Sequence, residues 1–301
     1  MATTAPAEAG TITAPARPRR SVGQRWVALW LPALPLLVII GALLLAPALL
    51  LIVQSFSGNS GLTLDLWARV LGSALNREAI VTSVVLGVTC ATIATMIGAP
   101  MAWLISRMFP RSRAGWLALL NVAANFGGIG LAFAYIAVLG TQGMITLGLQ
   151  GAGLGFVPPR PSSFIGLTAA YSYTNVPLFV LLTIPAMGIL RAEWWEAAQT
   201  ASATRWQFWR MIGIPVLTPF IAGGWLLIFT WSIGIYGIAY GLAGGGGAAA
   251  IALITLQIGN ILGTDVFGAG RAAVLAVLLM AMATASLVIY RWLLRRALRW
   301  L

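Results

Sequence analysis

The segment Glu196-Ala197-Ala198-Gln199-Thr200-Ala201-Ser202, followed by Ile212-Gly213-Ile214-Pro215, is the most informative stretch of this chain. It is polar and aromatic, and it lies between two long apolar segments. Only 8% of the chain is charged, yet several charged residues gather here within twenty positions: Arg191, Glu193, Glu196, Arg205 and Arg210. Alanine, glutamate, glutamine and arginine all favour helix formation. The sequence therefore predicts a short helical loop between two membrane spans.

The composition of the 301 residues is that of a chain embedded in lipid. Hydrophobic residues make up 60% of it and charged residues 8%, which is outside the range of soluble globular domains. The net charge of +12 comes from eighteen basic residues, all of them arginine, which lie at the ends of apolar segments instead of on one basic face. We therefore expect membrane lipid, and no nucleic acid, among the partners of the chain.

The residue inventory excludes several kinds of chemistry. The chain has no histidine, so a Ser-His-Asp site and a histidine-based zinc site are impossible within it. Its one cysteine, Cys90, lies inside an apolar stretch, which excludes a disulfide framework and a thiolate metal site. Without any lysine it also lacks a phosphate-binding P-loop, and the glycine run 244–247 is a flexible connection. We predict no catalytic residue, no metal site and no cofactor.

The apolar runs predict an all-helical membrane protein with six spans. Arginines lead into the first run, Val27 to Val53, without a signal-peptide cleavage site, so we expect it to be retained as a helix. Residues 1–25 are predicted to form a disordered cytoplasmic tail, and 26–301 the transmembrane domain. The other predicted spans are Ala79–Ser106, Trp116–Leu139, Phe164–Leu190, Pro219–Leu242 and Phe267–Leu294. The apolar stretch Ala248–Ile261 is short for a span, so we expect a re-entrant or amphipathic outer segment.

Arginine placement predicts which side each loop faces. Fourteen arginines would lie inside: Arg17, Arg19, Arg20, Arg25, Arg107, Arg111, Arg113, Arg191, Arg205, Arg210, Arg291, Arg295, Arg296 and Arg299. Four would lie outside: Arg69, Arg77, Arg160 and Arg271. This asymmetry follows the positive-inside rule. It predicts a plasma (inner) membrane protein with both termini and the Glu196 loop in the cytoplasm, and with segments 54–78, 140–163 and 243–266 outside.

The Glu196 segment closely resembles the EAA loop of the permeases of type I, binding-protein-dependent ABC importers. The resemblance lies in the spacing: Glu-Ala-Ala, three residues, a small residue, nine residues, then Ile-x-Ile-Pro. Two positions depart from the family pattern, since Ser202 stands where glycine is usual and Ile214 where leucine is usual. A side chain at 202 would tighten a bend that glycine allows.

That resemblance implies a coupling loop, residues 191–218, whose short helix docks in a groove on a separate ATPase subunit. The residues expected to serve the coupling are Glu196, Ala197, Ala198, Ser202, Ile212, Ile214 and Pro215. Glu196 would pair with a basic residue of the groove, and the two alanines would permit close approach. The implied partners are an ATPase dimer that binds the ATP, a second permease subunit or a second copy of this chain, and an extracytoplasmic substrate-binding protein.

Within the family, roughly Ala79 to Trp300 is similar to permeases of the spermidine/putrescine type. The similar segments run from Asn125 to Phe133, Leu139 to Gly143, Pro177 to Ala186, Arg205 to Trp209, Gly234 to Leu242 and Gly263 to Phe267. This similarity implies a polyamine-like solute. Iron, thiamine or a sugar are alternative solutes, because related permeases have similar patterns.

The sequence does not meet the residue requirements of two other classes of function. An integral-membrane enzyme needs carboxylates or histidines clustered at one depth, whereas Asp65, Glu78 and Asp265 are scattered in outer segments. An ion-coupled secondary carrier usually has an ionisable residue deep inside a span, whereas the charged residues within the predicted spans are Arg271 and Arg291, near the two ends of the last one. Both remain alternatives that a transport assay would separate.

Polar and aromatic residues within the predicted spans are the candidates for lining the solute path. They are Asn121 and Asn125, Tyr171, Tyr173 and Asn175, and Trp231, Tyr236 and Tyr240. Tyr171, Asn175 and Leu178 are spaced to share one helix face. Aromatic faces and amide oxygens could hold a cation there. The alternative role is structural, since aromatic residues near span ends anchor in the interface and asparagine often bonds between helices. Asp265 could serve the outer mouth or the binding protein.

Overall fold

The computed structural model describes residues 33–58, 61–153, 159–243 and 251–297. The chain divides into two compact units, residues 1–50 and 51–301, which are described separately. The predicted tail 1–25, the start of the first predicted span and the glycine run 244–247 lie outside the described residues.

The described part of the first unit is a single apolar helix. It is the first part of α2 (Leu34–Phe56), which contains Pro47 and is long and apolar enough to cross a membrane. Its leucines are exposed, with Leu43 and Leu44 showing 69% and 66% of their surface. A helix with exposed apolar side chains suits lipid and not water, as expected for a retained first span.

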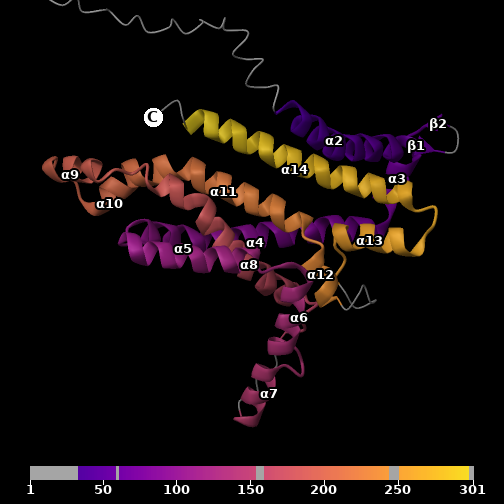
Figure 1. The fold of residues 1–301 in the computed structure, drawn as a ribbon, viewed down its shortest axis with the longest axis horizontal. Coiled ribbons are helices and arrows are strands. Elements are labelled where there is room, and N and C mark those ends of the chain that lie inside the picture. Colours follow the sequence, from indigo (N-terminus) through magenta and orange to yellow (C-terminus); the bar gives the residue numbers. More distant parts are fainter. Residues whose placement is uncertain (1–32, 59–60, 154–158, 244–250, 298–301) are drawn as a thin grey trace, which may run out of the picture. The chain divides into compact units, whose positions relative to one another are not determined.

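The second unit begins with the end of α2, residues 51–56, which a two-stranded antiparallel hairpin and then further helices follow (Figure 1). Its elements are β1 (Ser57–Gly58), β2 (Gly61–Leu62), α3 (Asp65–Gly72), α4 (Ala74–Ser106), α5 (Pro110–Asn125), α6 (Gly128–Leu139), α7 (Met144–Gly151), α8 (Phe164–Met187), α9 (Ala192–Thr200), α10 (Arg205–Phe208), the π-helix η1 (Trp209–Gly213), α11 (Ile214–Gly234), α12 (Gly237–Leu242), α13 (Ile254–Thr264) and α14 (Ala269–Ala297). The helix α13 begins inside the predicted segment 248–261, at Ile254, and continues beyond its end to Thr264.

The core of the second unit forms where α4, α8 and α11 pack together, with α14 against α11 and α5 against α8 (Figure 1). Phe179 of α8 is fully buried there. A Cβ atom added to Gly98 of α4 would lie 2.6 Å from the ring of Phe179, and one added to Gly224 of α11 would lie 2.9 Å from it. The ring thus fills space that only glycine leaves free, which is the small-residue packing expected of membrane helices.

Two predicted spans have different bounds in the structure. The predicted span Trp116–Leu139 is broken after Asn125, so it consists of α5 and α6; the long apolar stretch here is Gly128–Gly151 instead. The break is local, because Gly128 has a left-handed φ of 69° that an α-helix cannot contain. The predicted span Pro219–Leu242 is also wrong at both ends, since the apolar helical stretch runs over Arg205–Gly234 and α12 is separate.

Among the described residues, six helical stretches are long and apolar enough to cross a membrane. They are Leu34–Phe56, Ala74–Ser106, Gly128–Gly151, Phe164–Met187, Arg205–Gly234 and Ala269–Arg295. The prediction of a helical integral membrane protein with about six spans is therefore confirmed.

Candidate functional site

The Glu196 segment folds as a helix that ends in a tight local turn. Helix α9 is followed by Ser202, whose φ of 59° is in the left-handed region. The N–H of Ala203 donates to the carbonyl of Ala198, and the N–H of Ser202 donates to that of Gln199, both at 2.9 Å. These two bonds form the Schellman motif that commonly ends a helix at glycine. Ser202, which departs from the usual glycine, therefore has a left-handed conformation that glycine would adopt without strain.

A second local motif starts the next helix directly after this turn. Thr204 accepts a hydrogen bond from the N–H of Gln207, and the Gln207 side chain accepts one from the N–H of Thr204. This capping box satisfies N–H groups that a helix start leaves free. The helix then widens into η1, where the Trp209 ring lies so close to Gly213 that an added Cβ would be 2.5 Å from it.

Aromatic side chains join this loop to the end of α4. Trp195 of α9 contacts Phe208 with ring centroids 5.2 Å apart, and Phe208 contacts Trp209 at 6.2 Å. Trp209 in turn meets Trp103 of α4 edge-on at 4.7 Å, and the Arg107 guanidinium lies 4.0 Å over the Trp103 ring. Edge-to-face aromatic pairs and cation–π contacts each add stability beyond simple burial. The loop is thus held to a membrane-spanning helix by four rings.

The predicted coupling residues occupy different environments. Glu196, Ala197 and Ser202 are exposed, as are Ile214, at 52%, and Pro215, whereas Ile212 is half-buried against the core. The expectation that Ala198 faces outward with Ala197 is wrong: Ala198 is only 9% exposed. Its carbonyl accepts a hydrogen bond from the N–H of Ala203, where the chain folds back after α9.

The structure adds two exposed apolar side chains that sequence reasoning missed in this loop. Trp206 is 69% exposed and Met211 is 75% exposed. Large exposed apolar side chains beside exposed charges are typical of surfaces that bind another protein. One sequence signal could have identified them: they occur in a polar segment that is predicted to lie outside the spans.

A second discontinuity lies where two broken helices meet. The break between α5 and α6 contacts the break between α11 and α12, because an added Cβ on Gly237 would be 3.2 Å from the Cα of Gly128. The same break approaches α8, since a Cβ on Gly127 would lie 3.7 Å from Thr174. Figure 1 shows α6 and α12 side by side at this point. We call this the helix-break region, residues 125–128 and 234–237 with the adjoining face of α8.

Two predicted path residues are buried beneath this region. Tyr171 is fully buried and its hydroxyl donates to the carbonyl of Ile235 at 3.1 Å. Asn175 is also fully buried and donates through Nδ2 to the hydroxyl of Ser232 at 2.8 Å. Both bonds join α8 to the chain around the end of α11. In this conformation the two side chains bond helices together and do not face open space, contrary to the expectation that they line the path.

The other predicted path residues lie on the surface. Asn121 and Asn125 are exposed on α5, and each donates to the carbonyl four residues earlier. Tyr236 and Tyr240, at 40% and 36% exposure, stack with ring centroids 5.2 Å apart. Two further exposed candidates are Tyr173, at 48%, and Trp231, at 56%.

Phe126 is a member of this aromatic group that sequence reasoning missed. It is 47% exposed and meets the Tyr173 ring edge-on, with centroids 6.5 Å apart. The first backbone N–H groups of α6 lie immediately after it and receive no side-chain cap. Free N–H groups at the start of a helix favour negatively charged ligands. The helix-break region therefore combines exposed rings and amides with a weakly positive backbone end.

The described residues hold no group of three or more acidic or cysteine side chains that could bind a metal ion. Asp265 accepts a hydrogen bond from the N–H of Phe267 and forms an ion pair with Arg271, so its carboxylate is engaged within the chain.

No family model matches the sequence. The chain is 35% identical over 82 residues to the sulfate transport system permease protein CysT of Escherichia coli (strain K12), a match that covers 27% of this chain and 30% of that protein. It therefore spans less than a third of the length of this relative. It is also 25% identical over 224 residues to the molybdenum transport system permease protein ModB of Mycobacterium tuberculosis (strain ATCC 25618 / H37Rv), which covers 73% of this chain and 77% of that protein.

Solved structures extend the comparison to nearly the whole fold. A chain from the crystal structure of a bacterial ABC transporter involved in import of the acidic polysaccharide alginate superposes with a TM-score of 0.65 at 17% identity, covering 92% of this chain and 96% of that one. A second structure, of the bacterial alginate transporter in complex with a periplasmic protein bound to an alginate pentasaccharide, gives 0.66 at 16% identity. This chain therefore has the same helical membrane fold as a chain of that ABC transporter.

Proposed function

We propose that this chain is the membrane-spanning permease subunit of an ATP-driven, binding-protein-dependent ABC importer. The observation that carries the proposal is α9, which exposes Glu196 and Ala197 while its Trp195 is tied through Phe208 and Trp209 to α4. The shared fold and the permease names of the sulfate and molybdenum relatives support it.

In this function α9 inserts into a groove on the ATPase subunit, which binds and hydrolyses the ATP. Glu196 has no ion-pair partner within the described residues, so it is available to a basic residue of the groove. Ala197 lets the helix approach closely, and Trp206 and Met211 supply apolar contact beside it. Because rigid packed contacts transmit displacement between elements, a movement of α9 reaches α4 through the four rings.

For the solute we propose a small oxyanion. The sequence similarity to spermidine/putrescine-type permeases favoured a polyamine, but the relatives are named for sulfate and molybdenum, and the alginate transporter imports an acidic polysaccharide. The uncapped start of α6 supports an anion, because half-helix N-termini point at anionic groups in membrane transporters. Calorimetry on the cognate binding protein with sulfate, molybdate, putrescine and spermidine tests this choice. Binding of a polyamine without either oxyanion would reverse it.

We further propose that the chain lies in the inner membrane with α9 in the cytoplasm, and that it pairs with a second permease subunit or with its own copy. Maleimide labelling of intact cells from outside tests the orientation in a Cys90→Ser background. Cysteine at position 150 should be labelled and cysteine at position 199 should not. The opposite pattern would contradict the orientation and would place α9 out of reach of an ATPase.

Transport in proteoliposomes tests the function itself. The chain is co-purified with its proposed ATPase, second permease and binding protein, and uptake of radioactive sulfate is measured with and without ATP. Uptake should require ATP and should be lost with Glu196→Ala, whereas Glu78→Ala, an exposed acid on α4, should keep it. Uptake driven by an ion gradient without ATP would favour a secondary carrier instead.

A further inference from the structure

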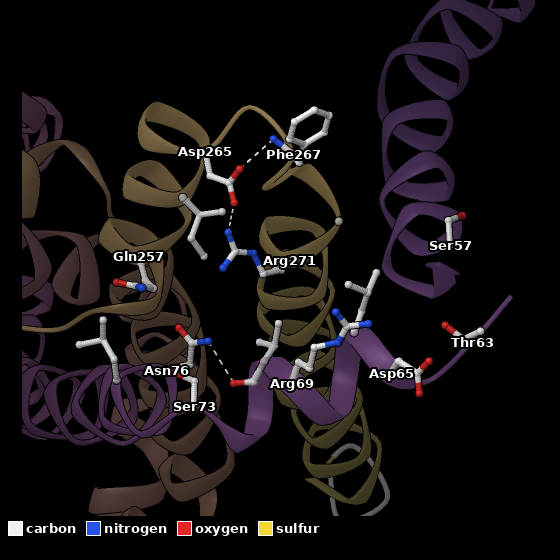
Figure 2. A pocket seen from close by; sticks show the side chains of 15 residues that line it. Ser57, Thr63, Asp65, Arg69, Ser73, Asn76, Gln257, Asp265, Phe267 and Arg271 are labelled. Atoms are coloured by element: carbon white, nitrogen blue, oxygen red, sulfur yellow. Dashed lines mark hydrogen bonds and ion pairs between the residues drawn. The ribbon is translucent and has the colours of Figure 1, made fainter. Parts of the chain in front are cut away.

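A polar cavity of about 740 Å³, lined by no residue of the coupling loop or of residues 125–128 and 234–237, lies where α3, α13 and the start of α14 meet (Figure 2). Its polar side chains are Ser57, Thr63, Asp65, Arg69, Ser73, Asn76, Gln257, Asp265 and Arg271. Figure 2 shows the amides of Asn76 and Gln257 and the guanidinium of Arg271 around one space. Neither the coupling loop nor the solute path accounts for this cavity.

The cavity lies at the level where membrane spans begin and end. Helix α2 ends at Phe56, α4 begins at Ala74 and α14 begins at Ala269, and residues next to all three ends line the cavity. The ends of apolar spans mark the boundary between the hydrocarbon and the headgroups of a bilayer. The cavity is thus at the depth of phospholipid headgroups.

The charges in the cavity balance, but only half of them are paired. Asp265 and Arg271 form the one ion pair found among the described residues. Asp65 and Arg69 are four positions apart on α3, a spacing that permits a pair, yet none forms. The cavity therefore presents one free carboxylate and one free guanidinium, which complement a ligand carrying both a positive and a negative group.

Two buried acceptors in the lining lack a partner. Asn76 is 7% exposed and donates through Nδ2 to the carbonyl of Val70 at 3.0 Å, while its Oδ1 has no partner. The hydroxyl oxygen of Thr63 is also buried and unpartnered. Buried polar atoms in proteins are nearly always hydrogen-bonded. Neither atom is reachable from the cavity in this structure, so the groups that can meet a ligand are the exposed charges of Asp65 and Arg69.

An apolar groove of about 410 Å³ adjoins the polar cavity. It is lined by Ile52, Val53, Phe56, Thr63 and Leu64, and Thr63 also lines the polar cavity. A ligand at Thr63 could therefore place a polar head in one space and an apolar tail in the other.

We propose that the cavity and the groove together bind one phospholipid of the ethanolamine class. Arg69 binds its phosphate, Asp65 binds its ammonium, and one acyl chain lies in the groove past Leu64. The Asp65 carboxylate can accept N–H hydrogen bonds from a primary ammonium but not from a trimethylammonium, which selects ethanolamine over choline, and it disfavours an anionic headgroup that lacks an ammonium. The inference rests on the membrane-spanning fold and not on the transport role, so either can fail without the other.

Native mass spectrometry of the full purified chain tests the proposal. The chain is mixed with equimolar phosphatidylethanolamine, phosphatidylcholine and phosphatidylglycerol with the same acyl chains, and the retained lipid is quantified. We expect the ethanolamine lipid to be retained at least fivefold over each of the others. This result needs no variant, so it does not depend on any substitution being folded.

Two sets of variants locate the bound lipid. Asp65→Asn with Arg69→Gln should abolish the selectivity, and Leu64→Trp, which fills the groove, should reduce total retention at least fivefold. The matched control is Arg77→Gln with Glu78→Gln, which removes one exposed charge of each sign outside the cavity. Equal retention of the three lipids, a preference for phosphatidylglycerol, or equal effects of the cavity and control pairs would each overturn the proposal.

Discussion

The loop from α9 to η1 and the helix-break region are both interruptions in long helices, but different forces hold them. In the loop, neighbouring residues satisfy the backbone: Ser202 and Ala203 close α9, and Thr204 with Gln207 caps α10. In the helix-break region, segments far apart in the sequence meet through Gly128 and Gly237. The first interruption is a local motif that exposes Glu196 and Ala197. The second is a tertiary contact between two broken helices.

Removing the exposed carboxylate of the loop should have the largest effect. Glu196→Ala is expected to leave the chain folded, because Glu196 is exposed and forms no ion pair within the described residues. Truncating one member of a buried charge pair at an interface costs roughly 2–5 kcal/mol. ATP-driven uptake should therefore fall about 30-fold or more. Uptake at the level of the Glu78→Ala control would remove the reason for calling α9 the coupling element.

Gly237→Val should disrupt the contact between the two helix breaks, whereas Gly234→Val should not. A side chain at 237 meets the backbone of Gly128, which cannot rotate away, whereas position 234 is open. Overpacking of this kind costs roughly 1–3 kcal/mol. The midpoint of thermal unfolding in detergent should fall for Gly237→Val alone. Equal midpoints for the two variants would show that the close approach does not hold the breaks together.

Trp209→Ala tests whether the four rings anchor the loop. Without Trp209, contact from Phe208 to Trp103 is lost, and amide hydrogen exchange in α9 should accelerate about tenfold, which corresponds to ~1.4 kcal/mol. Trp206→Ala is the control, because Trp206 is 69% exposed and holds nothing in place within the described chain. If both variants exchange at the wild-type rate, local hydrogen bonds alone hold the loop.

Substitutions of two tyrosines distinguish the role of the buried side of the helix-break region from that of its exposed side. Tyr171→Phe loses the bond to Ile235 and should cost about 1 kcal/mol of stability, with little change in the KM for uptake. Tyr240→Ala should leave stability nearly unchanged and should alter that KM, since Tyr240 stacks on Tyr236 at the surface. Uptake kinetics and thermal unfolding of the same preparations check both. A KM change confined to Tyr171→Phe would indicate that Tyr171 lines the solute path.

The smallest effect is expected at the end of α9. Ser202→Gly relieves the left-handed strain at φ 59°, which should stabilise the fold by roughly 1–2 kcal/mol. Glycine also raises the conformational entropy of the unfolded chain, which lowers stability by about 0.4–1 kcal/mol. We expect a slight gain in stability and unchanged uptake. The control, Ala203→Gly, has no positive φ to relieve and should lower stability slightly. A loss of stability with Ser202→Gly would mean that the serine side chain serves the turn.

The same contrast explains how far the sequence predicts the structure. Long apolar runs predicted the six-span helical fold, and the spacing around Glu196 predicted a helix in the loop, because both signals are local. The break before Gly128 escaped prediction, since the apolar run continues through it and a glycine in an apolar run does not show that it adopts a left-handed φ. The burial of Tyr171 and Asn175 was missed for a related reason. Helical spacing gives the shared face of two residues but not the neighbour that covers it.

Crosslinking tests the central claim, the docking of α9 on an ATPase, most directly. Cysteine is placed at Ala197 in the Cys90→Ser background, paired with a cysteine in the groove of the co-purified ATPase, and oxidised with and without ATP. The account predicts an efficient crosslink from position 197 whose yield changes when ATP binds, and none from cysteine at Gly148, which is exposed on α7. Absence of a crosslink at 197 in an assembly that binds the ATPase and transports solute would contradict it.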